Sequence, residues 1–136
     1  MNKEQIEIEI RRMERKLSNV REQIRKQKNT IEDNEYKLDK LKRSLDKTMD
    51  NYRIFDRTNE SFENLSELRF IKTWVEARKE KNASDKRKAT AKMDESYREQ
   101  KKVVNASYQK LDDLEETKAR YERELKRLKR MFNEMP

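Results

Sequence analysis

The chain has 136 residues, of which 47% are charged and 32% hydrophobic, and its formal net charge at pH 7 is +8. It contains no glycine, cysteine or histidine, and its single proline is the last residue. Because glycine and proline form many of the turns in proteins, a chain without them is expected to fold into few, long helices. The missing residue types also exclude disulfides, thiol chemistry and metal sites built from histidine or cysteine. We therefore predict an all-α protein that is not an enzyme and binds neither a cofactor nor a metal.

The first predicted helix covers about residues 3 to 56 and carries one apolar stripe with alternating steps of four and three residues. The stripe consists of Ile6, Ile10, Met13, Leu17, Val20, Ile24, Gln27, Ile31, Asn34, Leu38, Leu41, Leu45, Thr48, Tyr52 and Phe55. A repeat of seven residues is typical of a left-handed coiled coil, in which about two positions in seven face a partner helix. The same periodicity argues against disorder, which the high charge alone would favour.

A tip is predicted at about residues 57 to 66, because the segment DRTNESFENLSEL at 56–68 is rich in residues that favour turns and helix caps. Asn64 and Glu67 are spaced like a capping box at the start of a following helix. The second helix is therefore expected at about residues 67 to 134. Its stripe consists of Thr90, Met93, Tyr97, Gln100, Val104, Ser107, Leu111, Leu114, Lys118, Tyr121, Leu125, Leu128, Phe132 and Met135.

Two heptad helices joined by a short tip favour an antiparallel hairpin, because the connection keeps them at high effective concentration. We predict that residues 1–136 form a single long antiparallel two-helix coiled-coil hairpin with an aromatic-rich tip. Only registers that differ by whole heptads fit both stripes. The preferred one places Gln27 beside Tyr97 and Asn34 beside Thr90, so that polar side chains face polar side chains.

Residues 67–80, ELRFIKTWVEARKE, contain the only tryptophan of the chain and form an apolar face that is wider than the heptad stripe. This face is also out of phase with the stripe that begins at Thr90. One interpretation is a small core that covers the tip, and another is a docking surface, since tryptophan is enriched at binding hot spots. The predicted partner-binding residues are Phe62, Phe70, Ile71, Trp74 and Val75.

The positive charge does not predict nucleic-acid binding, because acidic residues are interleaved with the basic ones along the whole chain. The densest basic segment, residues 85–92, is interpreted as a solvated face or as a contact to an acidic protein. No apolar run approaches the roughly 20 residues that a membrane span needs. The N-terminal residues also lack the apolar core of a signal peptide. We expect a cytoplasmic protein without membrane insertion, and co-export without a cleaved signal is an open alternative.

A long heptad helix, a break and a second helix that opens with a tryptophan resemble the Trp-x-Gly helical-hairpin superfamily of type VII secretion. The small α-helical proteins associated with LXG toxins of Gram-positive bacteria are the most similar group in layout. Trp74 and Val75 match the motif, and Glu76 stands in place of its glycine. The resemblance implies a non-enzymatic hairpin that binds the helical N-terminal domain of a toxin and promotes its export.

The resemblance also implies an export signal of the form Tyr-x-x-x-Asp/Glu. Tyr108 and Asp112 match this pattern and form the candidate signal, and Tyr52 and Asp56 match it as well. Both pairs lie on predicted helices. Five tyrosines in an acid-rich chain produce about one such match by chance, so the pattern carries less weight than the tryptophan.

Two other functions fit a charged two-helix coiled coil. One is a component of a type III or flagellar export apparatus resembling the FliJ-like stalk proteins, which bind through both chain ends, here residues 1–20 and 114–136. The other is a generic coiled-coil scaffold, including a homodimer. The stalk proteins insert both chain ends into a hexameric ATPase ring, whereas the toxin-binding and scaffold functions predict another helical protein or a second copy as the partner.

Overall fold

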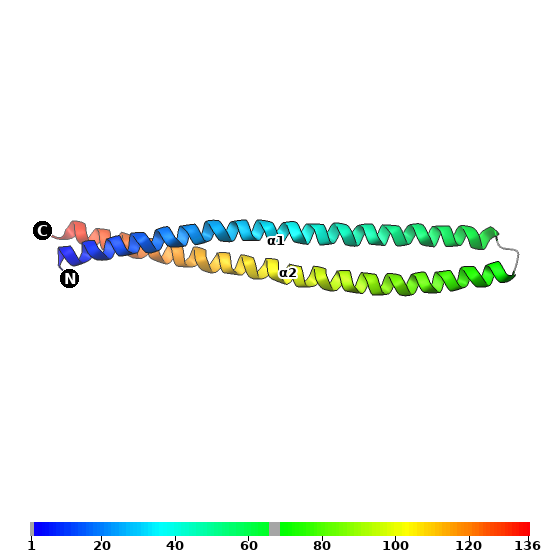
Figure 1. Ribbon diagram of the computed structural model, residues 1–136. Helices are drawn as coiled ribbons and strands as arrows, with labels where there is room; N and C mark the ends of the chain where they lie inside the picture. The colour runs from blue at the N-terminus through cyan, green and yellow to red at the C-terminus, as the bar shows by residue number, and fades with distance from the viewer. Residues whose placement is uncertain (1, 66–68) are drawn as a thin grey trace. The chain divides into compact units, whose positions relative to one another are not determined.

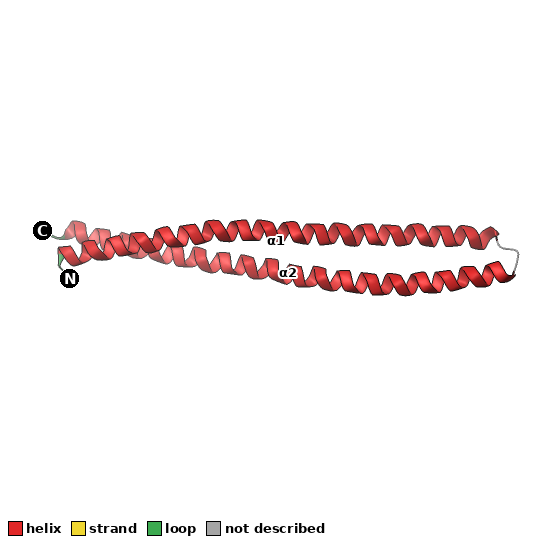
Figure 2. Ribbon diagram, in the orientation of Figure 1, coloured by secondary structure: helices red, strands yellow, loops and turns green. Residues whose placement is uncertain are grey.

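The computed structural model describes the backbone of residues 2–65 and 69–136, and the side chains at all of these positions except 59, 61–65 and 69–73. Two helices account for almost all of the described backbone, α1 (Lys3–Leu65) and α2 (Arg69–Glu134). They run antiparallel to each other (Figures 1 and 2), and no strand occurs in the described ranges. The predicted all-α helical hairpin is thus confirmed.

Helix α1 begins with a reciprocal cap. The backbone N–H of Gln5 donates to Asn2 Oδ1 at 2.8 Å, and the backbone N–H of Asn2 donates to Gln5 Oε1 at 2.9 Å. These two bonds satisfy donors that have no acceptor inside the first helical turn.

Helix α1 ends later than predicted, because residues 57–65, which we expected in the tip, are helical. The polar residues of this segment are compatible with a helix when their side chains bond to the preceding turn. Thr58 shows this, since its Oγ1 donates to the carbonyl oxygen of Ile54 at 2.9 Å. The predicted cap formed by Asn64 and Glu67 falls on side chains outside the described part of the chain.

The chain divides into two compact units. The terminal unit combines residues 1–34 with residues 103–136, and the central unit consists of residues 35–102. In each of them a stretch of α1 packs against an antiparallel stretch of α2. Sequence analysis predicted one hairpin without a second domain, and it did not predict this division.

The terminal unit has an apolar core made of the predicted stripe positions. Its buried apolar side chains are Ile6, Leu17, Val20, Ile24, Ile31, Val104 and Leu128. Each such side chain contributes roughly 1.5–3 kcal/mol when it is removed from water. Two lysines of α1 make cation–π contacts with aromatic rings of α2 beside this core. The Nζ of Lys3 lies 4.8 Å from the ring centroid of Phe132, and the Nζ of Lys16 lies 5.9 Å from the ring centroid of Tyr121.

A buried polar layer interrupts this core at Gln27 and Ser107. Gln27 Nε2 donates to the carbonyl oxygen of Ser107 at 2.8 Å, and Asn34 Nδ2 donates to Ser107 Oγ at 3.0 Å. Ser107 Oγ in turn donates to the carbonyl oxygen of Val103 at 2.9 Å. One serine thus supplies acceptors to both amides, and the layer is fully hydrogen-bonded, as buried polar groups must be to avoid a large cost.

The register that we preferred from the sequence is therefore wrong. Gln27 contacts Ser107 rather than Tyr97, and the polar partner of Asn34 is Ser107 rather than Thr90. Thr90 instead lies in the central unit, where its Oγ1 is 3.8 Å from the sulfur of Met49. Matching polar residues one to one could not find this register, because a single serine serves two amides.

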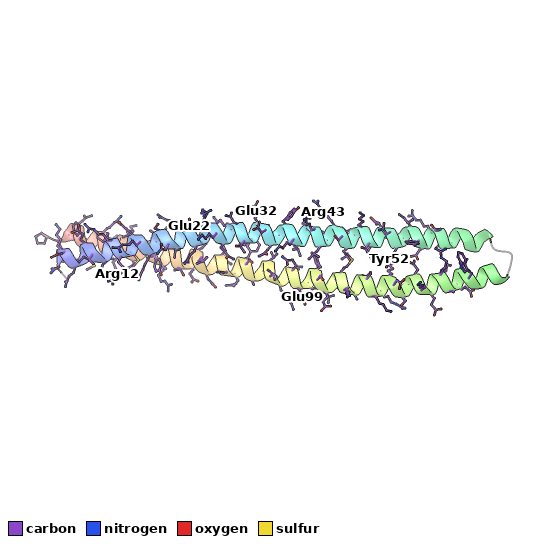
Figure 3. The ribbon with its side chains drawn as sticks, viewed as in Figure 1. Arg12, Glu22, Glu32, Arg43, Tyr52 and Glu99 are labelled. Carbon is purple, nitrogen blue, oxygen red and sulfur yellow. The ribbon has the colours of Figure 1, made fainter. Side chains whose placement is uncertain are left out.

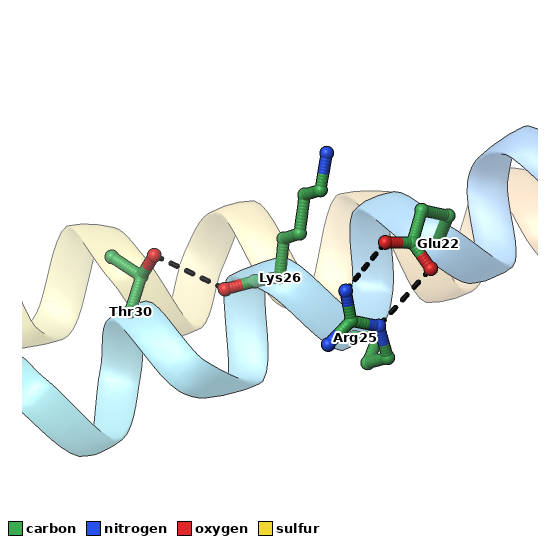
Figure 4. A network of polar contacts seen from close by, with 4 residues as sticks. All are labelled: Glu22, Arg25, Lys26 and Thr30. Atoms are coloured by element: carbon green, nitrogen blue, oxygen red, sulfur yellow. Dashed lines mark hydrogen bonds and ion pairs between the residues drawn. The ribbon is translucent and has the colours of Figure 1, made fainter.

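Exposed ion pairs within single helices cover the outer faces, and Figure 4 shows one of them. The guanidinium of Arg25 donates two hydrogen bonds to the carboxylate of Glu22, at 2.6 and 3.0 Å. These hydrogen bonds lower the pKa of Glu22 and raise that of Arg25. Arg127 and Glu124 form the same arrangement on α2, with the same effect on the pKa of Glu124.

Spin labels can test the register, because the chain has no cysteine and labels can be attached at introduced ones. Arg21 Nη2 lies 3.8 Å from Glu122 Oε1, so labels at Arg21→Cys and Glu122→Cys should give one short, narrow distance distribution by double electron–electron resonance. Adding Gln27→Leu and Asn34→Leu should broaden it, since only the polar layer distinguishes this register from those one heptad away. Thermal stability should be kept or raised in the same variant.

The matched control for this experiment is Lys28→Leu with Asn29→Leu, which adds leucines at exposed positions of the same helix. It should leave the distribution narrow. A narrow distribution in the variant without the polar layer would show instead that the apolar residues alone set the register.

The pKa of Glu22, measured by NMR titration, should rise toward its ordinary value in Arg25→Gln, because the hydrogen bond from Arg25 is the largest cause of its lowering. Lys26→Gln should raise it less, since the charge of Lys26 is a smaller cause. With a folded-state pKa below the unfolded one, the stabilisation is present above the unfolded pKa and is lost as pH falls through the folded pKa. The stability difference between wild type and Arg25→Gln should therefore shrink on acidification, and a pH-independent difference would contradict this origin.

Candidate protein-binding surface

The apolar stripe of α1 is less well covered in the central unit than in the terminal unit. Leu38, Leu41, Leu45 and Tyr52 are only half-buried, and Phe55 is 50% exposed. Figure 3 shows Tyr52 directed toward α2, whereas Arg43 points away from it. The apolar stripe of α1 therefore faces α2, but α2 does not cover it completely.

The composition of α2 explains the incomplete cover. The α2 segment 77–91 carries four alanines together with polar and basic residues, and it contains no leucine, isoleucine, valine or aromatic residue. This segment lies beside Tyr52 and Phe55, and an alanine side chain is too short to fill the space next to an aromatic ring, so part of the apolar area of these two residues stays accessible.

A groove with a volume of about 390 Å³ lies between the two helices of the central unit. Helix α1 contributes the aromatic rings of Tyr52 and Phe55, and α2 contributes polar and charged side chains. The lining residues are Tyr52, Phe55, Arg78, Lys81, Asn82 and Asp85. Asn82 Nδ2 donates to Asp56 Oδ1 at 3.0 Å, and this bond joins α2 to α1 beside the groove. The groove combines apolar rings with an excess of positive charge.

Trp74 lies next to this groove through its contact with Arg78. The guanidinium carbon of Arg78 is 4.8 Å from the ring centroid of Trp74, one helical turn away on α2. This cation–π contact favours one orientation of both side chains. Trp74 is nevertheless 49% exposed. We refer to Trp74 together with the groove residues as the Trp74 surface.

The predicted partner-binding residues differ in how exposed their side chains are. Trp74 is exposed, as a docking residue has to be. Val75 is only 1% exposed, so it is a core residue and the prediction that it faces a partner is wrong. Its position next to Trp74 in the sequence puts it on another face of α2. The side chains of Phe62, Phe70 and Ile71 lie outside the described part of the chain, and their role stays a prediction.

Of the seven residues of the surface, only Trp74 was among the predicted partner-binding residues, and the six that line the groove were missed. Phe55 belongs to the predicted stripe and was therefore assigned to the core. Arg78 could have been found, because it follows Trp74 by four residues and such pairs are neighbours on a helix. Lys81 had no distinguishing signal in a chain with 36 basic residues.

The candidate export signal lies on α2 in the terminal unit. Tyr108 is 44% exposed, and Asp112 is exposed one helical turn further along. The second match to the same pattern is less accessible, since Tyr52 is half-buried and Asp56 accepts the hydrogen bond from Asn82. Tyr108 and Asp112 are thus the better placed of the two pairs for recognition by another protein.

Within the described residues, no group of three or more acidic side chains is arranged to hold a metal ion. Over the same ranges, neither helix contains a stretch that is apolar enough to cross a membrane. Comparison of the chain with protein-family models, with curated proteins and with solved structures gives no match.

The different environments of Trp74 and Val75 predict losses of stability that differ in size. Val75→Ala should lower the free energy of unfolding by about 2 kcal/mol, because it removes two buried methyl groups worth about 0.8 kcal/mol each and leaves a small cavity. Trp74→Ala should lower it by less than half as much, since the indole is half in water. Urea denaturation followed by circular dichroism measures both values. Equal losses would place Trp74 in the core.

Proposed function

We propose that this chain is a non-catalytic partner protein that binds the helical N-terminal domain of an LXG-type toxin and targets it for type VII secretion. The observation that supports a binding role is the half-exposed Trp74, held by Arg78 beside the groove that contains Phe55. Exposed aromatic side chains grouped around a groove are characteristic of binding hot spots. The toxin as partner rests on the resemblance of the layout and of Trp74 to the Trp-x-Gly hairpins.

A helical partner suits the shape of the surface. The accessible residues of α1 in the central unit follow the heptad repeat, so their apolar side chains lie along one line. A third helix lying along that line would cover them by the same side-chain packing that joins α1 to α2. The chain would act in the cytoplasm, where the toxin is made, and Tyr108 with Asp112 would serve as the export signal if the two proteins leave together.

A stalk protein of the FliJ type would bind through the chain ends instead. In the terminal unit, however, Ile6, Leu17 and Leu128 are already buried within the hairpin. Ile8 is 53% exposed near the N-terminus, whereas the central unit has the exposed rings of Phe55 and Trp74 beside one groove, which favours binding at the Trp74 surface.

Trp74→Ala should weaken binding to the helical N-terminal domain of an LXG toxin from the same organism by about tenfold or more, because hot-spot aromatic side chains contribute more than about 1.4 kcal/mol. Isothermal titration calorimetry measures the affinity. Tyr36→Ala is the matched control. Tyr36 is 60% exposed in the same unit and has Lys40 Nζ 4.7 Å from its ring centroid, so it reproduces the aromatic–cation pair away from the groove.

Three outcomes would contradict the proposal. If the toxin domain does not bind, the assignment to LXG toxins is wrong. If binding survives Trp74→Ala but is lost on charge reversal within residues 1–20 and 114–136, the chain ends carry the interaction, as in a stalk protein. If light scattering shows only a self-associated species, the chain is a homomeric scaffold.

A further inference from the structure

We infer that the partner segment on the Trp74 surface is an acidic amphipathic helix that lies along one face of α2 from Trp74 to Lys92. Its apolar residues cover the exposed rings of Phe55 and Trp74, and its carboxylates pair with the basic side chains of α2. The inference rests on the proposed function, because it specifies the chemistry of the partner at the same surface.

The first support is a second heptad stripe on α2. Its members follow alternating steps of three and four residues, the spacing with which a helix faces another helix. They are Arg78, Lys81, Asp85, Lys88, Lys92 and Glu95. This stripe is charged rather than apolar, which is why an apolar pattern does not reveal it.

The second support is that two hollows follow this stripe and meet at Asp85. The groove contains Arg78, Lys81 and Asp85. A second, shallow depression shares Asp85 with the groove and is lined by α2 alone, through Asp85, Lys88, Ala89, Ala91, Lys92 and Glu95. Its two alanines allow the backbone of another helix to approach closely. Trp74 and Lys92 are 18 residues apart, which corresponds to about 27 Å of α-helix, so the face has room for about five helical turns.

The third support is the charge of this face. The stripe itself has four basic and two acidic side chains, a net charge of +2, and the whole segment 78–92 has seven basic and two acidic ones, a net charge of +5. Within the stripe, Asp85 lies between Lys81 and Lys88, so the carboxylate does not make the face negative. A helix with glutamate or aspartate beside its apolar positions matches this potential, and electrostatic complementarity of this kind selects partners and raises association rates.

The same charge disfavours two other occupants. A second copy of this chain would bring an identical basic stripe against this one, and like charges in contact cost affinity. A nucleic acid would need its phosphates to follow a row of cations, whereas this row includes Asp85 and Glu95 and adjoins alanines and aromatic rings. An acidic protein helix can satisfy both the apolar and the charged parts of the face.

A displayed library of amphipathic helical peptides tests the inference. The peptides are about three heptads long, with leucine fixed at the apolar positions and glutamate, lysine or glutamine at the flanking ones. Selection on the wild-type chain should enrich peptides with net negative charge. The selected peptides should shift the emission of Trp74, the only tryptophan, to shorter wavelength as they cover it.

Charge reversal locates the contact. Arg78→Glu with Lys81→Glu should weaken the selected acidic peptides by about tenfold or more and should enrich lysine-rich peptides when the selection is repeated. The control, Lys101→Glu with Lys102→Glu, changes the net charge equally at exposed positions of the same unit and should alter affinity by less than about twofold. Circular dichroism confirms that each variant is folded.

The inference is overturned if selection yields no binders, if the binders show no preference for acidic residues, or if both double variants weaken binding equally. It is also overturned if oligothymidylate shifts Trp74 emission at lower concentration than the peptides do, or if dimerisation of the chain alone shifts it. These outcomes are independent of the toxin-binding measurement. If binding of the toxin domain requires Trp74 but not the charges of α2, this inference alone is contradicted. If acidic peptides bind and the toxin domain does not, the proposed function alone is contradicted.

Discussion

Burial of one narrow apolar stripe between α1 and α2 is the interaction that holds this structure together. A chain with 47% charged residues has few apolar side chains from which to build a core, and the heptad repeat places about half of them on the line where the two helices meet. The exposed ion pairs, such as Arg25 with Glu22, keep the outer faces soluble and add little to folding. Stability at each level along the hairpin therefore depends on what α2 places opposite the stripe of α1.

The two units differ in this respect. In the terminal unit, α2 supplies Val104 and Leu128, and the facing residues of α1 are buried. In the central unit, the α2 segment 77–91 supplies alanines and basic side chains, and the facing residues of α1 stay half-exposed. The polar layer of Gln27, Asn34 and Ser107 lies in the terminal unit and adds specificity to the apolar packing, because it is satisfied in one register.

The fold class, the two helices and the positions of the apolar stripe follow from the sequence, since periodicity and the absence of glycine and proline are local signals. The register and the end of α1 did not follow. Register depends on three-dimensional hydrogen bonding, and the two acceptors of Ser107 could not be counted from residue types alone. The end of α1 was misjudged because Thr58 bonds to its own helix instead of ending it. The same limit applies to the surface: Trp74 was conspicuous in the sequence, but only the packing separates it from the buried Val75.

The weak cover of the α1 stripe has a consequence for function. Leucine in the α2 segment 77–91 would have buried Tyr52 and Phe55 more fully, at little cost to helix formation. The chain has short and charged side chains there instead, so the central unit gives up stability that its own stripe could have provided. Such a loss is expected where a binding partner completes the packing, because the apolar area then contributes to affinity rather than to folding of the free chain. The charged heptad stripe from Arg78 to Glu95 lies in the same part of α2. The segment of α2 that leaves apolar side chains of α1 partly exposed therefore also has the heptad spacing with which a helix faces a third helix.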